Sequence, residues 1–288
     1  MVGKNLLMAA AKRAKSSAQA MEFWLSGAVD LGVIEIAGQT ITDLALLGNP
    51  STPGITKAGR LSLTGRCQGR RVKVYSAHSA RQVLLRRALG DLDFGKFRFP
   101  KIIVANDVLV AEEWISGQTV ANSASIIGAQ AEMAVDRFIS ELQSRPETSR
   151  LAGEYLDSFD YLDDYLVARL GAWRQLTLIQ NYLSCWKDLR SKLEGVLPVR
   201  VSHPDLSRAN VLHEQGSGQF VVVDNELLGA GQGWILDRRN SFVPSTGNSP
   251  ELEAFTAMTW GLRKIGSALD ASDLPLALAI ARQGMTVA

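Results

Sequence analysis

The chain has 288 residues, of which 46% are hydrophobic, and its 31 Lys and Arg residues nearly balance its 29 Asp and Glu residues. This length and apolar content suffice for one large domain or two smaller lobes with a sizeable core. A formal net charge of +2 lacks the basic excess typical of nucleic-acid-binding proteins, so we expect no nucleic-acid partner. Cys67 and Cys185 form no CxxC or Cys/His cluster, which argues against a zinc site or a disulfide framework and favours a cytoplasmic setting.

Residues 1–21 are predicted to form a basic helical extension. Nowhere does the chain approach the roughly 20 apolar residues that a membrane-spanning helix needs. The apolar run Leu6–Ala11 is short, and Lys12 and Arg13 follow it where a signal-peptide cleavage site would stand. Two interpretations stay open for residues 1–20: a frayed extension, or an amphipathic helix in peripheral contact with the inner face of a membrane.

Residues 22–115, the second predicted unit, contain short β-type runs separated by turn residues. One further segment, Ser79–Leu89, has apolar residues at helical spacing. The pattern predicts a small antiparallel sheet that carries one helix. The predicted strands are Val33–Ile36, Leu61–Thr64, Arg71–Tyr75, Ile102–Ala105 and Val108–Trp114.

Residues 116–288, the third predicted unit, are mainly helical by their apolar periodicity. A strand pair interrupts the helices, with 211–213 and 220–223 joined across Gly216, Ser217 and Gly218. The predicted helices are 123–144, 151–170, 172–195, 251–267 and 273–284.

Asn210 and Asp224 flank this predicted hairpin. Both are seven residues from Ser217, so a symmetric hairpin would place them opposite each other. An amide oxygen and a carboxylate brought together suit a hard cation such as Mg²⁺, which usually keeps coordination positions for water and nucleotide phosphates. A one-residue shift of register would spoil the pairing.

Asp205 precedes the hairpin in the stretch HPDLSRANVL, on a segment where Pro204 disfavours a regular strand. A loop there can aim the carboxylate beside the same metal. A hydroxyl that attacks phosphorus needs a carboxylate within hydrogen-bond reach. Asp205 is therefore the predicted proton acceptor or orienting group.

The motif His203-x-Asp205-x₄-Asn210, a strand, a turn, a strand and then Asp224-x-Glu226 resembles the aminoglycoside phosphotransferase and choline kinase group of kinase-like enzymes. The resemblance implies an α+β, two-lobed protein kinase-like fold with a small antiparallel-sheet lobe and a larger, mainly helical lobe. It implies that Asp205 is the catalytic base and that His203 supports the loop. The implied Mg²⁺ site consists of Asn210 and Asp224, with Glu226 near the metal.

The nucleotide site is implied by the same resemblance. Lys73, in Arg71–Tyr75, resembles the strand lysine that holds the phosphates of ATP in kinase-like folds. The stretch VLVAEEWISG resembles the last strand of the small lobe and the following hinge. Its backbone around Glu112 to Trp114 would bind adenine.

The helix predicted at 79–89 departs from the family pattern, because it contains no Glu to pair with Lys73. Gln82 could hydrogen-bond the lysine, and Asp91 or Asp93 could supply a carboxylate from the end of the helix. These alternatives stay open.

Two further segments match the family order. The candidate for the phosphate-covering loop is Gly54–Gly59, for which an ordinary turn is the alternative. Gly231-x₅-Asp237 resembles the downstream segment whose Asp braces the catalytic loop.

The predicted function is phosphorylation of a hydroxyl group with ATP and Mg²⁺. The acceptor stays open among a small amino alcohol, a sugar or aminoglycoside, and a cell-envelope glycan, the last slightly favoured by the basic N-terminal segment. The alternative is a pseudokinase that binds nucleotide or acts as a scaffold, suggested by the missing helix Glu and the irregular glycine segment. The sequence gives no indication of oligomeric state.

Overall fold

The structure is a computed structural model of the chain, and some of the residues singled out above lie outside the part it describes. Residues 1–21, the glycine segment 54–59, Glu226 and Asp237 are among them, so the predictions made for them stay predictions. The described residues are 31–47, 62–77, 79–107, 109–156, 166, 167, 169–193, 195, 196, 199–203, 205–225, 228–231 and 249–285.

The chain divides into two compact units. The first, here called the sheet unit, contains residues 1–134 and 209–226, and the second, the helical unit, contains 135–208 and 227–288. The sequence suggested a boundary after residue 115, whereas the structure groups the hairpin at 209–226 with the sheet unit. Hydrogen bonding explains this grouping, because both hairpin strands pair with strands formed by residues 97–119.

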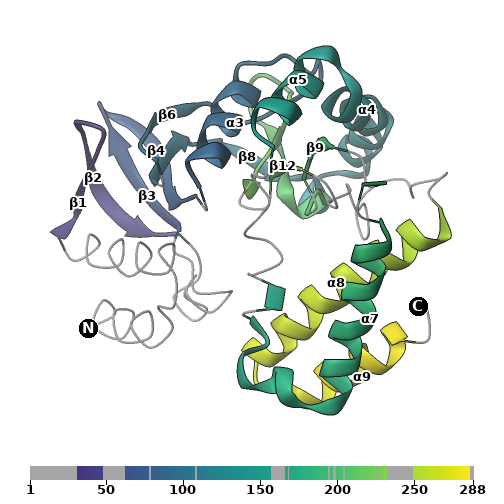
Figure 1. Cartoon of the computed structure of the whole chain (residues 1–288). Helices are drawn as coiled ribbons and strands as arrows, with labels where there is room; N and C mark the ends of the chain where they lie inside the picture. Colours follow the sequence, from purple (N-terminus) through teal and green to yellow (C-terminus); the bar gives the residue numbers. More distant parts are fainter. Residues whose placement is uncertain are drawn as a thin grey trace. The chain divides into compact units, whose positions relative to one another are not determined.

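A six-stranded antiparallel sheet forms the first part of the sheet unit (Figure 1). Its strand order is β1-β2-β3-β4-β7-β6. The five predicted strands are present, with ends shifted by up to three residues. The strands are β1 (Val33–Ile36), β2 (Gln39–Leu46), β3 (Ser62–Cys67), β4 (Arg70–Ser76), β6 (Ile102–Ala105) and β7 (Leu109–Glu113).

Strand β2 was not predicted, and its irregular backbone explains why. Asp43 has a φ of 54°, in the left-handed region, and the pairing with β3 shifts between Thr42 and Ala45. Such a bulge interrupts the period-two alternation by which a strand is found in sequence. Ile41 and Leu44 are nonetheless buried in the core of the sheet.

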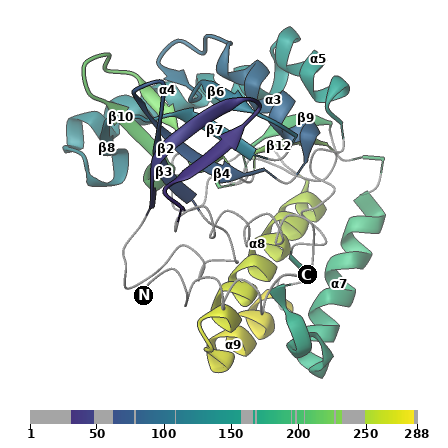
Figure 2. The same cartoon turned by 90° about the vertical axis from the view of Figure 1, so that its left-hand side faces the viewer.

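Side chains alternate between the two faces of β4, as its sequence predicts. Val72 and Val74 join one apolar cluster, whereas Tyr75 packs with Val83 of helix α3 (Ala80–Gly90) in another. The helix begins at Ser79, whose Oγ accepts a hydrogen bond from the Gln82 N–H at 3.2 Å. Figure 2 gives a second view of these strands and of α3.

A second sheet of the sheet unit carries the hairpin. Its order is β5-β11-β10-β8, with β5 parallel to β11 and the other pairs antiparallel. Arg98 of β5 forms ion pairs with Glu113 of β7 and Glu214 of β10, which ties the two sheets together. The strands are β5 (Phe97–Arg98), β8 (Gly117–Thr119), β10 (Val211–Glu214) and β11 (Phe220–Val222).

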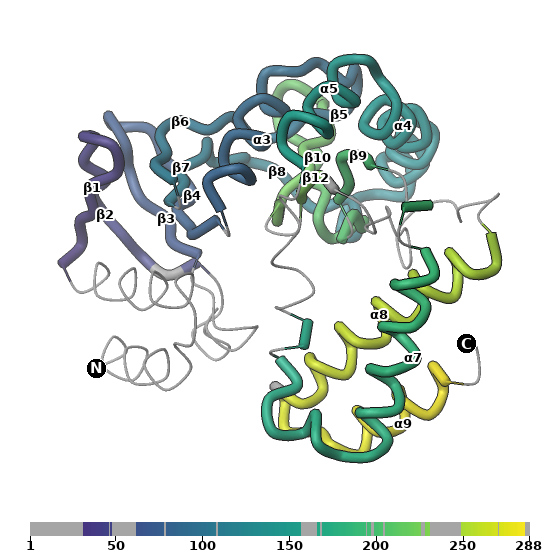
Figure 3. The backbone as a smooth tube through the Cα atoms, in the orientation of Figure 1, coloured from purple at the N-terminus to yellow at the C-terminus, as the bar shows by residue number. Residues whose placement is uncertain are grey.

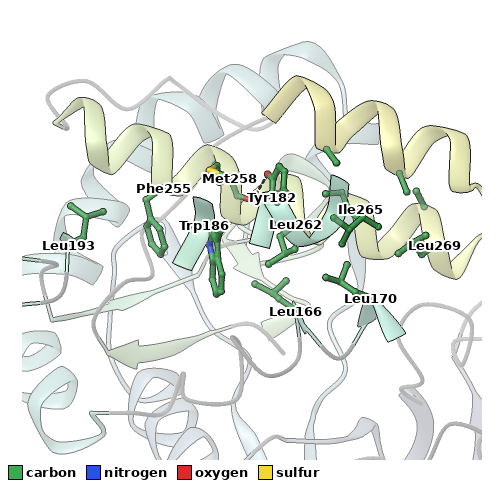
Figure 4. Packing of buried hydrophobic residues seen from close by; sticks show 14 residues of the cluster. Leu166, Leu170, Tyr182, Trp186, Leu193, Phe255, Met258, Leu262, Ile265 and Leu269 are labelled. Atoms are coloured by element: carbon green, nitrogen blue, oxygen red, sulfur yellow. Dashed lines mark hydrogen bonds between the residues drawn. The ribbon is translucent and has the colours of Figure 1, made fainter. Parts of the chain in front are cut away.

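Three helices of the helical unit, α7, α8 and α9, pack against one another around a core of large apolar side chains. Trp186 donates a hydrogen bond to Thr259 Oγ1 at 2.9 Å. The Tyr182 hydroxyl donates to the Met258 carbonyl at 2.8 Å (Figure 4). Trp186 thus lies in the core, as its helical periodicity predicts. The helices are α5 (Pro146–Glu154), α7 (Thr177–Leu193), α8 (Pro250–Asp270) and α9 (Leu274–Met285), and α4 (Ser125–Ser144) runs from one unit into the other.

The helical unit also holds a two-stranded sheet, in which β9 (Arg200–Ser202) pairs antiparallel with β12 (Gly229–Gly231) (Figure 3). Short 3₁₀ segments lie at Val120–Asn122, Gly171–Gln175 and Arg208–Asn210. Strand β9 leads directly into the stretch that contains Asp205. Among the helices that the structure describes, none has the length and apolar character needed to cross a membrane.

Candidate active site

The hairpin β10–β11 confirms the predicted strand pair but not its register. Leu212 is opposite Val221, and the Val223 N–H donates to the Asn210 carbonyl at 2.9 Å. Asn210 is therefore paired with Val223, and the prediction that it directly opposes Asp224 is wrong by one residue. The reason is the turn: its four residues, 215–218, are centred between Gly216 and Ser217 rather than on Ser217.

Asp224 follows β11 with an unusual backbone conformation. Its φ is 59°, in the left-handed region that costs a residue other than glycine about 1 kcal/mol or more. The next residue, Asn225, is buried and donates from Nδ2 to the Val222 carbonyl at 2.8 Å. Together they form a defined turn at the open end of the hairpin, and the turn places the Asp224 carboxylate outside the regular strand.

The donors at this end of the hairpin fit the chemistry of Mg²⁺. Asn210, Asp224 and Asn225 offer amide and carboxylate oxygens, which this ion prefers. Asn225 Oδ1 is buried and has no hydrogen-bond partner among the described residues, as is expected of an oxygen available to a cation or to water. Within the described ranges there is no group of three His, Cys, Asp or Glu side chains that could hold a metal by themselves. Mg²⁺ commonly completes its coordination with water and phosphate oxygens.

Lys73 lies opposite Glu112 in the pairing of β4 with β7. Its Nζ is 4.0 Å from Glu112 Oε1, and its side chain is 18% exposed against 2% for Glu112. The other carboxylate oxygen, Oε2, accepts from Arg86 of α3 at 2.7 Å and from the Tyr75 hydroxyl at 2.9 Å. In the described part of the chain, the carboxylate paired with Lys73 is thus supplied by strand β7.

This arrangement answers the question left open by the missing helix Glu. The carboxylate beside Lys73 comes from the neighbouring strand rather than from Asp91 or Asp93, and Asp93 Oδ1 accepts from the Gly95 N–H at 2.7 Å. Gln82 lies buried in the first turn of α3. Helix α3 contributes a cation, Arg86, where the family resemblance leads one to expect an anion.

Burial raises the pKa of Tyr75 well above its ordinary value near 10. Arg86 opposes this effect by favouring the phenolate, whereas the negative charge of Glu112 reinforces it. Tyr75 is therefore a neutral hydrogen-bond donor to Glu112 at any physiological pH. The guanidinium of Arg86 also lies 4.6 Å from the centre of the Tyr75 ring, a cation–π distance.

The predicted hinge follows β7. Glu112 itself lies within the strand, and the N–H groups of Glu113 and Trp114 donate to the carbonyls of Lys101 and Arg71 at 3.0 and 3.2 Å. The Trp114 ring is half-buried, with the Arg71 guanidinium 3.7 Å from its centre. Adenine binding by this segment stays a prediction, and the Glu112 side chain has a separate role beside Lys73.

Asp205 lies in a tight turn after β9. The Leu206 N–H donates to the His203 carbonyl at 3.0 Å and closes the turn around Asp205, while the His203 side chain is fully buried. Asp205 Oδ2 accepts from Arg263 Nη2 of α8 at 2.8 Å, and both side chains are about one-fifth exposed. The Arg263 guanidinium also lies 4.7 Å from the Trp260 ring centre. The role of His203 as a support for the loop stays a prediction, whereas Asp205 is held by Arg263 and is partly exposed to solvent.

Sequence reasoning did not identify Arg86, Tyr75 or Arg263. For Tyr75 a signal exists, because it is two residues from Lys73 on the same strand and so shares its face. Arg86 is a buried arginine one helical turn after the buried Gln82 of α3, which is a weak signal. Arg263 is 58 residues from its partner Asp205, and no local pattern joins them.

Neither a protein-family model nor a curated protein sequence matches this chain. Solved structures match it over nearly its whole length. Choline kinase LicA from Streptococcus pneumoniae is 12% identical, with a TM-score of 0.51, over 93% of this chain and 98% of that one. Plasmodium vivax ethanolamine kinase is 12% identical, with a TM-score of 0.53, over 93% and 86%.

A thermostable mutant of aminoglycoside phosphotransferase APH(4)-Ia is 14% identical to this chain, with a TM-score of 0.50, over 86% of this chain and 94% of that one. Identity at this level establishes the fold and leaves function to be argued from the site. These matches confirm, at the level of the fold, the resemblance identified in the sequence. The chain has the α+β, two-lobed protein kinase-like fold that choline kinase, ethanolamine kinase and aminoglycoside phosphotransferase share.

Proposed function

We propose that this chain is a phosphotransferase that uses ATP and Mg²⁺ to phosphorylate a hydroxyl group of a small molecule, sugar or cell-envelope glycan. The observation that carries the proposal is the open end of the hairpin β10–β11, where Asn210 and Asp224 supply oxygen donors on a kinase-like fold. Asp224 keeps a costly left-handed backbone there, and strain of this kind concentrates at functional sites.

Each residue has a defined task in the proposed reaction. Lys73 binds the phosphates of ATP, and Asp205 orients the acceptor hydroxyl and takes its proton. The acceptor oxygen forms a bond to the γ-phosphorus while the bond to the β,γ-bridging oxygen breaks and ADP leaves. Mg²⁺, when bound by Asn210 and Asp224 with Glu226 nearby, supplies positive charge that offsets the charge on the phosphates. The adenine contact falls to the segment around Glu112 and Trp114.

Arg263 supports a choice among the acceptor classes. An acceptor hydroxyl that is hydrogen-bonded to Asp205 lies beside the guanidinium that already bonds the same carboxylate. A cationic acceptor, such as an amino alcohol or aminoglycoside, brings positive charge toward Arg263, whereas a neutral or anionic hydroxyl compound does not. The ion pair therefore favours neutral and anionic acceptors, including sugars and acidic glycans.

The test is ATP consumption with Mg²⁺ across a panel of cationic, neutral and anionic hydroxyl compounds and a cell-envelope extract. We expect turnover that Asp205→Ala lowers by about 10²- to 10⁴-fold, the usual contribution of a general base. Arg263→Gln is the companion variant, and it should shift the preference toward cationic acceptors. Nucleotide binding without any Asp205-dependent turnover would instead support the pseudokinase alternative.

For a cell-envelope glycan acceptor, the proposal includes peripheral contact of residues 1–20 with the inner face of the membrane. Co-sedimentation with anionic lipid vesicles, compared with a variant in which Lys12, Arg13 and Lys15 are replaced by Gln, tests it. Equal sedimentation of the two proteins would refute the membrane contact and leave the phosphotransferase proposal untouched.

A further inference from the structure

This inference rests on the proposed function and concerns how Lys73 is held. Helix α3, ARQVLLRRALG, contains no acidic residue, so it cannot supply the carboxylate that kinase-like folds are expected to place beside the strand lysine. Glu112 lies on the adjacent strand β7, directly opposite Lys73 in the pairing of the strands. The carboxylate that faces Lys73 therefore belongs to the sheet itself.

The hydrogen bonds of Glu112 leave one of its carboxylate oxygens for Lys73. Oε2 accepts from Arg86 at 2.7 Å and from Tyr75 at 2.9 Å, which fixes the plane of the carboxylate. Oε1 faces Lys73 Nζ at 4.0 Å. At that distance the two charges attract without a hydrogen bond, so Glu112 occupies none of the three donors of the ammonium.

The charges of the cluster suit a phosphate ligand. Glu112, which is 2% exposed, faces two cations, Arg86 and Lys73, and Tyr75 is neutral. One negative and two positive charges leave an excess of one positive charge. The side chain of Lys73 is 18% exposed, against 4% for Arg86. A phosphate ligand would therefore meet the excess positive charge at Lys73.

The strand pairing also couples the position of Lys73 to that of Glu112, independently of helix α3. Lys73 and Glu112 are held in register by backbone hydrogen bonds between β4 and β7, whereas Arg86 reaches Glu112 from α3. A displacement of α3 would break the bond of Arg86 to Glu112 and would leave the strand register intact. The lysine is thus held by an element that does not move with the helix.

We infer that Glu112 is the positioning residue for Lys73 and that strand pairing, rather than α3, assembles the pair. Restraining a long, flexible lysine side chain before the nucleotide arrives lowers the entropy lost on binding. Helix α3 docks on a pair that already exists. Nucleotide affinity should therefore depend on Glu112 through Lys73 and depend little on Arg86.

A simpler account makes Glu112 only the buried counterion of Arg86. Both accounts predict a loss of stability when Glu112 is changed, because Arg86 then loses its partner. They differ in nucleotide binding, since a structural role does not act through Lys73. A double-mutant cycle between Lys73 and Glu112 separates the two accounts.

The experiment measures MgATP binding to the full chain by calorimetry, which needs no acceptor, alongside the midpoint of thermal unfolding. The variants are Lys73→Met, Glu112→Gln and their combination. Glu214→Gln is the matched control, because it neutralises another ion-paired carboxylate of the sheet unit, one that pairs with Arg98. Arg86→Met tests the helix.

We expect Lys73→Met and Glu112→Gln each to weaken binding by about tenfold or more, as loss of a bond to a charged group does. The double variant should bind no more weakly than Lys73→Met, within about twofold. Glu214→Gln should leave affinity within about twofold of wild type. Arg86→Met should lower the midpoint of thermal unfolding but should weaken MgATP binding by less than about threefold.

Losses that multiply in the double variant, or a Glu112→Gln protein that binds like Glu214→Gln, would overturn the inference while leaving the proposed function in place. Failure of the wild-type protein to bind MgATP would overturn the proposed function and this inference with it. If Glu112→Gln does not fold, the cycle is run in the Arg86→Met background. That background removes the unpaired buried cation, and apolar replacement of a buried pair is often tolerated.

Discussion

Lys73 and Asp224, a predicted phosphate contact and a predicted metal contact of the sheet unit, are held by opposite kinds of backbone. Lys73 lies within a regular strand, and its partner Glu112 is set by the pairing of β4 with β7. Asp224 lies just past the end of a strand with a left-handed φ of 59°. One position is maintained by repeated backbone hydrogen bonds, and the other is a single turn that works against local preference.

Asp205 in the helical unit, like Asp224, is positioned by a short turn outside regular structure. It lies in a turn closed by one backbone hydrogen bond, from Leu206 to His203, and its carboxylate is held by Arg263. Regular structure thus positions the lysine, whereas short irregular turns position the two aspartates. Substitutions at the turns should alter activity more than stability, whereas substitutions that disturb the apolar packing of the sheet should alter stability more than activity.

Substitution of Asp224 should change activity most, and at this position the loss of the carboxylate can be separated from the relief of backbone strain. Asp224→Ala and Asp224→Gly both remove the carboxylate, and each should lower turnover by roughly 10²- to 10³-fold, as loss of one preorganised electrostatic contact does. Only glycine adopts the left-handed backbone without strain, so the Gly variant should be about 1 kcal/mol more stable than the Ala variant. Urea unfolding and ATP turnover of the two proteins measure this. Equal stability would show that the φ of Asp224 carries no strain.

The sequence predicted the regular half of this comparison better than the irregular half. Alternation along β4 separated Lys73 from the valines beside it, and that assignment needs only the period of a strand. The partner Glu112 was interpreted as part of the hinge, because which residue of β7 faces Lys73 depends on a register between strands far apart in sequence. Neither strand encodes that register alone.

The hairpin shows the limit of local reasoning most clearly. Its strands follow from the β-type runs 211–213 and 220–223, yet Asn210 is opposite Val223 because the turn contains four residues rather than three. A single residue in a turn decides which side chains converge, and Gly216, Ser217 and Gly218 permit either arrangement. The contact of Arg263 with Asp205 could not be predicted from the sequence for another reason, because it depends on tertiary packing.

Gly65 on β3 tests the regular half of the comparison. A Cβ built there would lie 2.7 Å from Ile41 Cγ2 and 3.0 Å from the Thr42 carbonyl oxygen, in a buried part of the sheet. Gly65→Ala should therefore destabilise the protein by roughly 1–3 kcal/mol, the usual cost of overpacking. The readout is the urea midpoint. Gly153→Ala, where nothing lies within 4 Å, is the control and should be neutral or stabilising.

Tyr75, which bonds the Glu112 carboxylate beside Lys73, should make the free energy of unfolding depend on pH above pH 10. Its pKa in the fold is raised above the value near 10 that the unfolded chain has, mainly by burial. The stabilisation from neutral Tyr75 is thus complete below pH 10, and it falls above pH 10 as the unfolded state loses its proton, by up to about 1.4 kcal/mol per pH unit. Unfolding free energies of wild type and Tyr75→Phe at pH 8 to 11 measure this. Curves that stay parallel would contradict it.

The smallest expected effect tests whether the helix controls the lysine. Ser79 caps α3, with its Oγ accepting from the Gln82 N–H at 3.2 Å, so Ser79→Ala should cost about 1 kcal/mol of stability through fraying of the first turn. Because Lys73 and Glu112 are paired through the strands, MgATP affinity should change by less than about twofold. Ser249→Ala, which removes the corresponding cap of α8 in the helical unit, is the matched control for stability. If Ser79→Ala weakens MgATP binding as much as Glu112→Gln does, helix α3 controls the position of Lys73. The conclusion that strand pairing positions this lysine would then be wrong.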